Sequence, residues 1–207
     1  MLRRENHFAP LTFMLLMPLS RPVVREALLV VFGFSFLALL SQVRIMLPFT
    51  PVPVTLQTLA VLLVALSFGS LRGGITVASY IVGGAIGIPV FAGGACGWKH
   101  LLGPTGGYLV GFFFAALFVG YLAGIGWSKS FWRSFVAALI GTLIIYIFGA
   151  LWLSLFVGFS KAIMLGILPF IPGDLLKALV AASILPSMWK VIPKNGSLCH
   201  DGSFNQQ

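Results

Sequence analysis

The chain has 207 residues, of which 59% are hydrophobic and only 8% are charged, and its mean hydropathy is +1.05. A soluble domain is about 45–50% apolar and about 25% charged, so this composition excludes an ordinary water-soluble fold and favours a helical membrane protein. A net charge of +9 on a soluble protein would suggest nucleic-acid binding, but here the basic residues are scattered between apolar runs, so we expect no nucleic-acid partner.

The two ends of the chain differ from its middle. Residues 1–25 are basic, with a short apolar stretch that no small-x-small cleavage site follows cleanly. We interpret them as an uncleaved N-terminal extension that lies at the membrane interface. Residues 26–190 form the predicted membrane domain, and residues 191–207 form a polar tail. The two cysteines, Cys96 and Cys199, make neither a metal-ligand spacing nor a disulfide framework.

The middle of the chain contains six apolar segments that are candidates for crossing a hydrocarbon core, which takes about 20 helical residues. Several are apolar on every face, as lipid-buried helices are, and they lack the alternation of barrel strands. The sixth is the shortest and contains Lys177. We therefore predict an all-α integral membrane protein with six transmembrane helices, over residues 27–43, 54–71, 73–89, 101–128, 134–160 and 175–189.

The basic residues indicate how these segments cross the membrane. Six crossings place both termini on one side, and most Lys and Arg residues then fall on that side, including Arg72, Lys129 and Arg133. Arg44, Lys99 and Lys161 are the exceptions. Because positive charge marks the cytoplasmic side, we expect a multi-pass protein of the cell membrane with both termini in the cytoplasm.

The predicted outer loops have unusual compositions. The first contains "LPFTPVP", whose three prolines predict a stiff, extended segment. The second, residues 88–108, is rich in glycine, which permits close backbone approach. Because binding residues are concentrated on structured loops of a rigid scaffold, we expect a ligand at the outer face.

Two charged residues stand at the start of the sixth segment, in "IPGDLLK". Asp174 follows Pro172 and Gly173, so it is well placed to cap the helix at its N-terminus. Lys177 either extends its amine to the membrane interface or pairs with an anion, which Asp174 or a ligand carboxylate could supply. An ionisable pair inside a helical bundle predicts a functional site.

Other polar and aromatic residues belong to the same predicted face. Gln57 carries a donor and an acceptor, which suits an amide-like or urea-like group, although an interhelical hydrogen bond explains it equally well. Arg44 is either an interfacial anchor or a ligand contact. Five aromatic residues could wall an apolar pocket or mark the membrane interface: Tyr80, Phe91, Trp98, Tyr108 and Trp152.

Several motifs are missing from the sequence. It has no nucleotide-binding GxxxxGK[ST], no HExxH and no Ser–His–Asp set. Two intramembrane ionisable positions are also few for a proton relay. We therefore expect no enzyme activity, no cofactor and no nucleotide site.

Four stretches together resemble one known family: "PFTPVPVTLQTLAVLL", "GGAIGIPVFAGGACGW", "LLGPTGGYLVGF" and "PFIPGDLLKAL". The sequence from about Ala27 to Trp189 is similar to the BioY family. That family comprises the biotin-specific substrate-binding (S) components of energy-coupling factor (ECF) transporters. The resemblance implies an S-component-like bundle that binds biotin under the first loop, with Asp174, Lys177 and Gln57 in the site.

The resemblance also implies partners, namely a transmembrane T component and two cytoplasmic ATPases. Some members of the family have been proposed to work without them. S components often dock through a small-xxx-small motif on the first helix, and here only a loose set of Gly33, Ser35 and Ala38 corresponds to it.

We therefore predict a membrane component of a vitamin importer, with membrane lipid around it and biotin as its substrate. The alternatives are a structural membrane protein without a small-molecule ligand and a self-sufficient secondary transporter. The predicted substrate-binding residues are Asp174, Lys177, Gln57, Arg44, Tyr80, Phe91 and Tyr108.

Overall fold

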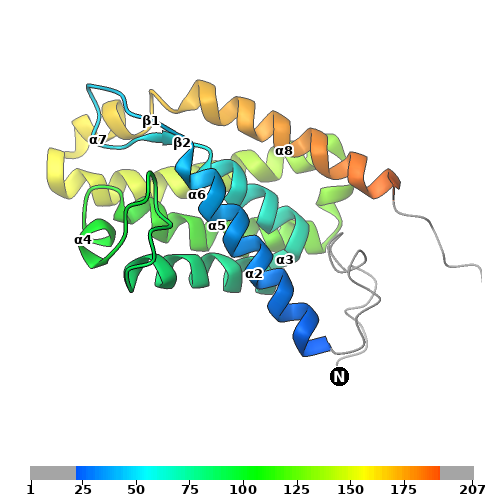
Figure 1. Ribbon diagram of the computed structural model, residues 1–207. Helices are drawn as coiled ribbons and strands as arrows, with labels where there is room; N and C mark the ends of the chain where they lie inside the picture. Colours follow the sequence, from blue (N-terminus) through cyan, green and yellow to red (C-terminus); the bar gives the residue numbers. More distant parts are fainter. Residues whose placement is uncertain (1–21, 192–207) are drawn as a thin grey trace, which may run out of the picture.

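The computed structural model describes residues 22–191, which are mostly helical (Figure 1). Among them, five helices are long and apolar enough to cross a membrane. They are α2 (Pro22–Gln42), α3 (Gln57–Ala85), α5 (Gly106–Gly124), α6 (Phe131–Val157) and α8 (Ile171–Val191). The first helix of the described part, α2, begins at Pro22, inside the predicted extension, whereas residues 1–21 and the tail from 192 lie outside that part of the chain.

The predicted second and third crossings share one label, α3, because they follow each other without a loop. The chain reverses direction between them at a kink. Gly69 has φ 79° and ψ −178°, a left-handed φ that glycine adopts readily. Gln57 Nε2 lies 2.7 Å from Tyr80 Oη, although 23 residues of straight helix would separate them by about 35 Å. Residues 57–68 and 70–85 are therefore two halves that run in opposite directions.

Shorter elements, which the sequence did not predict, occupy the connections. Strands β1 (Arg44–Ile45) and β2 (Val54–Thr55) pair antiparallel, with Arg44 opposite Thr55. They close the proline-rich segment into a hairpin whose tip, residues 46–53, we call the lid. Three further short elements are α4 (Trp98–Leu101), η2 (Trp127–Lys129) and α7 (Phe159–Gly166).

The centre of the bundle consists of α3, α5 and α6, where small residues let the helices approach closely. A Cβ at Gly111 of α5 would lie 3.0 Å from the Cα of Ile145 in α6. The helix α2 packs on α3, and a Cβ at Gly33 would meet Thr76 and Phe68 there. Gly33 therefore faces the inside of the protein, and its predicted place on a docking surface is wrong.

The start of α2 is tied to α3 by an ion pair at the end of the bundle that lies away from the lid. Arg72 Nη2 donates to Glu26 Oε1 over 2.9 Å, and Arg72 Nε donates to the other carboxylate oxygen. Both side chains are partly exposed, so the pair orients α2 more than it stabilises the fold.

A substitution at Gly84 tests whether the chain is closely packed beside the glycine-rich loop. A Cβ there would lie among the ring atoms of Phe91, which is fully buried. We expect Gly84→Ala to lower the free energy of unfolding by about 1–3 kcal/mol, as overpacking does. Gly124→Ala is the control, because a Cβ there meets nothing within 4 Å. Thermal unfolding of the two detergent-purified variants should differ, and equal midpoints would refute the packing argument.

Candidate ligand-binding site

A cavity lies beneath the lid, where the ends of several helices meet. It contains about 570 Å³ of atom-free space that is partly open to the outside. Its walls come from segments far apart in the sequence. The lining residues are Val52, Pro53, Thr55, Gln57, Thr58, Phe91, Ala92, His100, Thr105, Tyr108, Leu109, Phe112, Ile145, Tyr146, Phe170, Asp174 and Lys177.

Asp174 lies inside α8 and does not cap it. The helix begins at Ile171, with Pro172 in the first turn, where its missing N–H removes no helical hydrogen bond. Asp174 N donates to Phe170 O over 2.8 Å. The expectation of an N-terminal cap is therefore wrong, because the helix starts earlier than the Pro-Gly pair suggested, and the Asp174 side chain is free to face the cavity.

Lys177 lies on the same face of α8 as Asp174, three residues later, as helical spacing requires. Lys177 Nζ lies 2.7 Å from Asp174 Oδ1. The two residues are only 8% and 3% exposed, so the alternative in which the lysine amine reaches the membrane interface is wrong. The two opposite charges form a buried ion pair.

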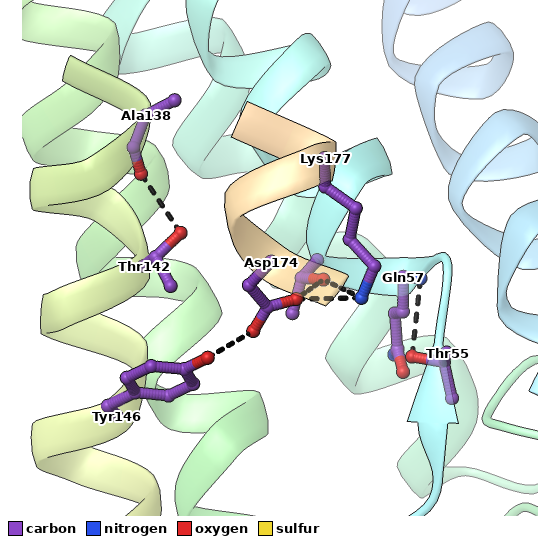
Figure 2. Close-up of polar contacts among 8 residues, drawn as sticks. Thr55, Gln57, Ala138, Thr142, Tyr146, Asp174 and Lys177 are labelled. Carbon is purple, nitrogen blue, oxygen red and sulfur yellow. Dashed lines mark hydrogen bonds and ion pairs between the residues drawn. The ribbon is translucent and has the colours of Figure 1, made fainter. Parts of the chain in front are cut away.

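Side chains from two other helices complete the polar network around this pair (Figure 2). Thr58 Oγ1 in α3 accepts from Lys177 Nζ over 3.0 Å and donates to Asp174 Oδ1 over 3.2 Å. Tyr146 Oη in α6 donates to Asp174 Oδ2 over 2.6 Å. A buried ion pair is tolerated only when further hydrogen bonds satisfy its atoms, and this network supplies them without changing the net charge of the pair.

The network keeps some hydrogen-bonding capacity towards the cavity. Lys177 has three N–H donors, of which two have partners among the described residues, Thr58 and Asp174. Gln57 Nε2 donates to Tyr80 Oη over 2.7 Å, which leaves the amide oxygen of Gln57 as an acceptor. This end of the cavity can therefore bind a neutral group that carries both a donor and an acceptor.

The other walls are aromatic. The Phe91 ring stacks on His100 with centroids 5.2 Å apart and meets Tyr80 edge-on at 5.6 Å. Burial lowers the pKa of His100 below its usual value, so this ring is neutral near pH 7. Tyr108 Oη donates to Gly166 O over 2.8 Å, which fixes that ring between α5 and the end of α7. These walls are suited to an apolar body next to a polar head.

The structure brings five of the seven predicted residues together in the lining: Asp174, Lys177, Gln57, Phe91 and Tyr108. Tyr80 lies behind Phe91 and contacts Gln57. Arg44 is exposed, with Nη1 3.4 Å from Ala92 O, beside the wall and outside the lining. The two tryptophans, also considered as walls, lie elsewhere: Trp98 is 62% exposed, and Trp152 Nε1 donates to Gly103 O.

Twelve of the lining residues were not among those predicted, and four of them are polar or aromatic side chains of the network and walls described above or near them: Thr58, Tyr146, His100 and Phe170. Tyr146 offered a signal, because it is the only tyrosine in the apolar segment 134–160 and a buried phenol usually finds a polar partner. Thr58 offered none, since a threonine beside Gln57 is unremarkable until α8 is placed against it.

These features define a class of protein: a helical membrane protein with a cavity beneath a hairpin, polar at one end and aromatic on its other walls. In the described part of the chain, no group of three or more His, Cys, Asp or Glu could hold a metal ion.

Comparison with known proteins specifies the class further. The family model described as "BioY family" matches residues 10–194, and the chain belongs to this family. A relative from Pyrococcus horikoshii, "Probable biotin transporter BioY", is 44% identical over 150 residues, which are 72% of this chain and 88% of the relative. "Biotin transporter BioY" from Rhizobium etli is 39% identical over 175 residues, covering 79% and 90% of the two chains.

A solved structure has a similar fold. It is described as "Crystal structure at 2.1 A of the S-component for biotin from an ECF-type ABC transporter" and superposes with a TM-score of 0.75 at 28% identity, covering 83% of this chain and 94% of its own. The predicted family is thus confirmed, and the chain is a multi-pass membrane protein of a transporter family and not an enzyme.

Proposed function

We propose that this chain is the biotin-binding membrane component of a vitamin uptake transporter and captures biotin in the cavity beneath the lid. The observation that carries the proposal is the buried Asp174–Lys177 pair, held by Thr58 and Tyr146 at one end of an aromatic-walled cavity. Similarity to proteins named as biotin transporters and to a biotin S-component supports biotin as the ligand.

The charge of the pair favours one orientation of biotin. The pair is neutral as a whole, so a ligand carboxylate placed there would add an uncompensated buried charge, which is costly. A cyclic urea is neutral and offers one carbonyl acceptor and two N–H donors. The carbonyl suits the third N–H of Lys177, and the N–H groups suit Asp174 and the amide oxygen of Gln57. The biotin carboxylate then lies at the mouth, near the exposed Arg44.

Two analogues test this orientation. Biotinamide, which lacks the carboxylate charge, should compete with radiolabelled biotin within about tenfold of biotin itself, since exposed ion pairs contribute little. The diamine obtained by removing the urea carbonyl should bind at least about 100-fold more weakly, because it leaves buried polar groups unpaired. The reverse ranking would mean that the carboxylate occupies the charged pair.

Transport is proposed to need an ECF module, with a T component and two ATPases. Similarity to an ECF biotin S component supports this partnership, and the absence of a nucleotide-binding motif from the sequence agrees with it. With Gly33 buried, the exposed Ser35 of α2 and its partly buried neighbour Ala38 remain as candidate docking residues.

We also propose six crossings, with the two halves of α3 counted separately and both termini in the cytoplasm. The reversal at Gly69 supports the count. The orientation rests on charge, because Arg72 and Arg133 belong to the end of the bundle where the described part of the chain begins and ends, whereas Arg44 and Lys99 belong to the lid end (Figure 1).

Labelling of intact cells tests the orientation. Native Cys96 is exposed in the glycine-rich loop, so it should react with a membrane-impermeant maleimide when Cys199 is replaced by serine. Arg133→Cys, at an exposed position at the start of α6, should react only after permeabilisation when both native cysteines are serine. Labelling of position 133 and protection of Cys96 on intact cells would mean that the chain has the opposite orientation in the membrane.

A further inference from the structure

The short helix α7 has one face buried in the protein and one face left uncovered. Ala162 and Gly166 are buried, whereas Phe159, Ile163 and Met164 are 64%, 37% and 60% exposed. A helix with large apolar side chains on its free face is typical of segments that lie in the membrane interface.

The lid is fastened to this helix. Thr50 Oγ1 donates to Leu165 O over 2.8 Å and accepts from Val52 N, and Thr50 itself is buried. Figure 1 shows the β1–β2 hairpin beside α7 at one end of the molecule. The neighbouring lid residues Met46 and Phe49 nevertheless remain 61% and 57% exposed, so the lid, like α7, carries large apolar side chains that the described part of the chain leaves uncovered.

The segments that flank α7 in the chain also have exposed apolar side chains. Leu155, near the end of α6, is 77% exposed, and Leu168 and Ile171, which lead into α8, are 53% and 44% exposed. Between Arg133 and Asp174 the sequence has a single charged residue, Lys161, which is exposed in α7. A lone exposed lysine beside an apolar face is complementary to acidic lipid headgroups.

We propose that the lid and α7 together are seated in the lipid of the outer leaflet, with Phe49, Phe159 and Met164 among acyl chains and Lys161 at the headgroup phosphates. The assignment to the outer leaflet rests on the proposed topology. The lid is then anchored on two sides, by the Thr50–Leu165 hydrogen bond and by lipid. Opening the cavity requires Phe49 to leave the bilayer, so the bilayer itself slows exchange of the ligand.

Nitroxide labels on single cysteines test this seating in liposomes of phosphatidylcholine and phosphatidylglycerol. Phe49→Cys and Met164→Cys are made in a protein whose two native cysteines are serine. The control, on the same face, is a protein that keeps native Cys96 and has only Cys199 replaced by serine. We expect labels at 49 and 164 to be relaxed more by oxygen, which partitions into lipid, than by a water-soluble nickel chelate, and the label at Cys96 to show the opposite. Nickel accessibility at 49 and 164 equal to that at Cys96, or protection from both reagents as in a protein contact, would overturn the proposal.

A kinetic comparison tests the consequence and depends on the proposed biotin binding. Phe49→Ser should release bound biotin from liposomes at least about fivefold faster than Phe49→Leu, because only leucine keeps an apolar side chain in the lipid. Equal release rates would mean that the lid is not held by lipid. If the wild-type protein binds no biotin, the proposed function fails, while the accessibility measurement still decides where the lid lies.

Discussion

Lys177→Ala should weaken biotin binding by more than about tenfold, because a charge-assisted hydrogen bond contributes about 1.5–3 kcal/mol. The same change leaves Asp174, which is 3% exposed, as a buried carboxylate without its cation. Breaking a buried pair on one side costs about 3–5 kcal/mol of stability, so the variant should also unfold at a lower temperature. Lys99→Ala, at an exposed position in α4, is the control and should change neither quantity.

A double variant separates ligand contact from stability. Asp174→Leu with Lys177→Met removes both charges at similar volume, which is often neutral or stabilising in a protein interior. We expect its unfolding temperature to recover relative to Lys177→Ala while biotin binding stays lost. Binding of radiolabelled biotin and thermal unfolding, measured on the same preparations, give the affinity and the unfolding temperature of each variant. A stable double variant with wild-type affinity would remove the pair from the ligand site.

Reconstituted protein alone should bind biotin without accumulating it, whereas addition of a T component, two ATPases and ATP should give accumulation above the outside concentration. Binding only equilibrates a solute, and the sequence contains no nucleotide-binding motif that could supply free energy. Of the Asp, Glu, Lys and Arg residues, only Lys177 lies within the predicted crossings, and it is paired with Asp174, which immediately precedes the sixth crossing.

Liposomes with and without the ECF subunits, loaded with ATP, provide the comparison. Replacing Ser35 and Ala38 of α2 by leucine should leave binding intact and reduce ATP-driven uptake, if small residues there allow close docking. Accumulation in liposomes that contain this chain alone would refute the partner proposal and leave biotin binding intact.

The site could be located from the sequence because charges are so scarce in this chain. Asp174 and Lys177 were conspicuous in an apolar segment, and both line the cavity. The proline-rich and glycine-rich loops were equally conspicuous, and both contribute to its walls. What could not be predicted is the tertiary arrangement: Thr58 and Tyr146 become partners of Asp174 only when α3, α6 and α8 meet.

Some local sequence signals predicted the wrong boundary or role, because the helix or the tertiary packing around them decides the outcome. Pro172 and Gly173 suggested a helix that begins at Asp174, yet both are accommodated in the first turn of α8. The break between the second and third crossings was expected near residue 72, where a charge interrupts the apolar run, but the chain reverses at Gly69, the residue whose backbone permits it. The small size of Gly33 likewise serves packing against Thr76 inside the protein.

Equilibrium binding of radiolabelled biotin to the purified wild-type chain, without any partner subunit, is the most direct test. We expect saturable binding to one site per chain, displaced by unlabelled biotin and lost in the double variant that lacks the Asp174–Lys177 pair. Absence of saturable binding by correctly folded wild-type protein, or equal binding by the double variant, would contradict this expectation.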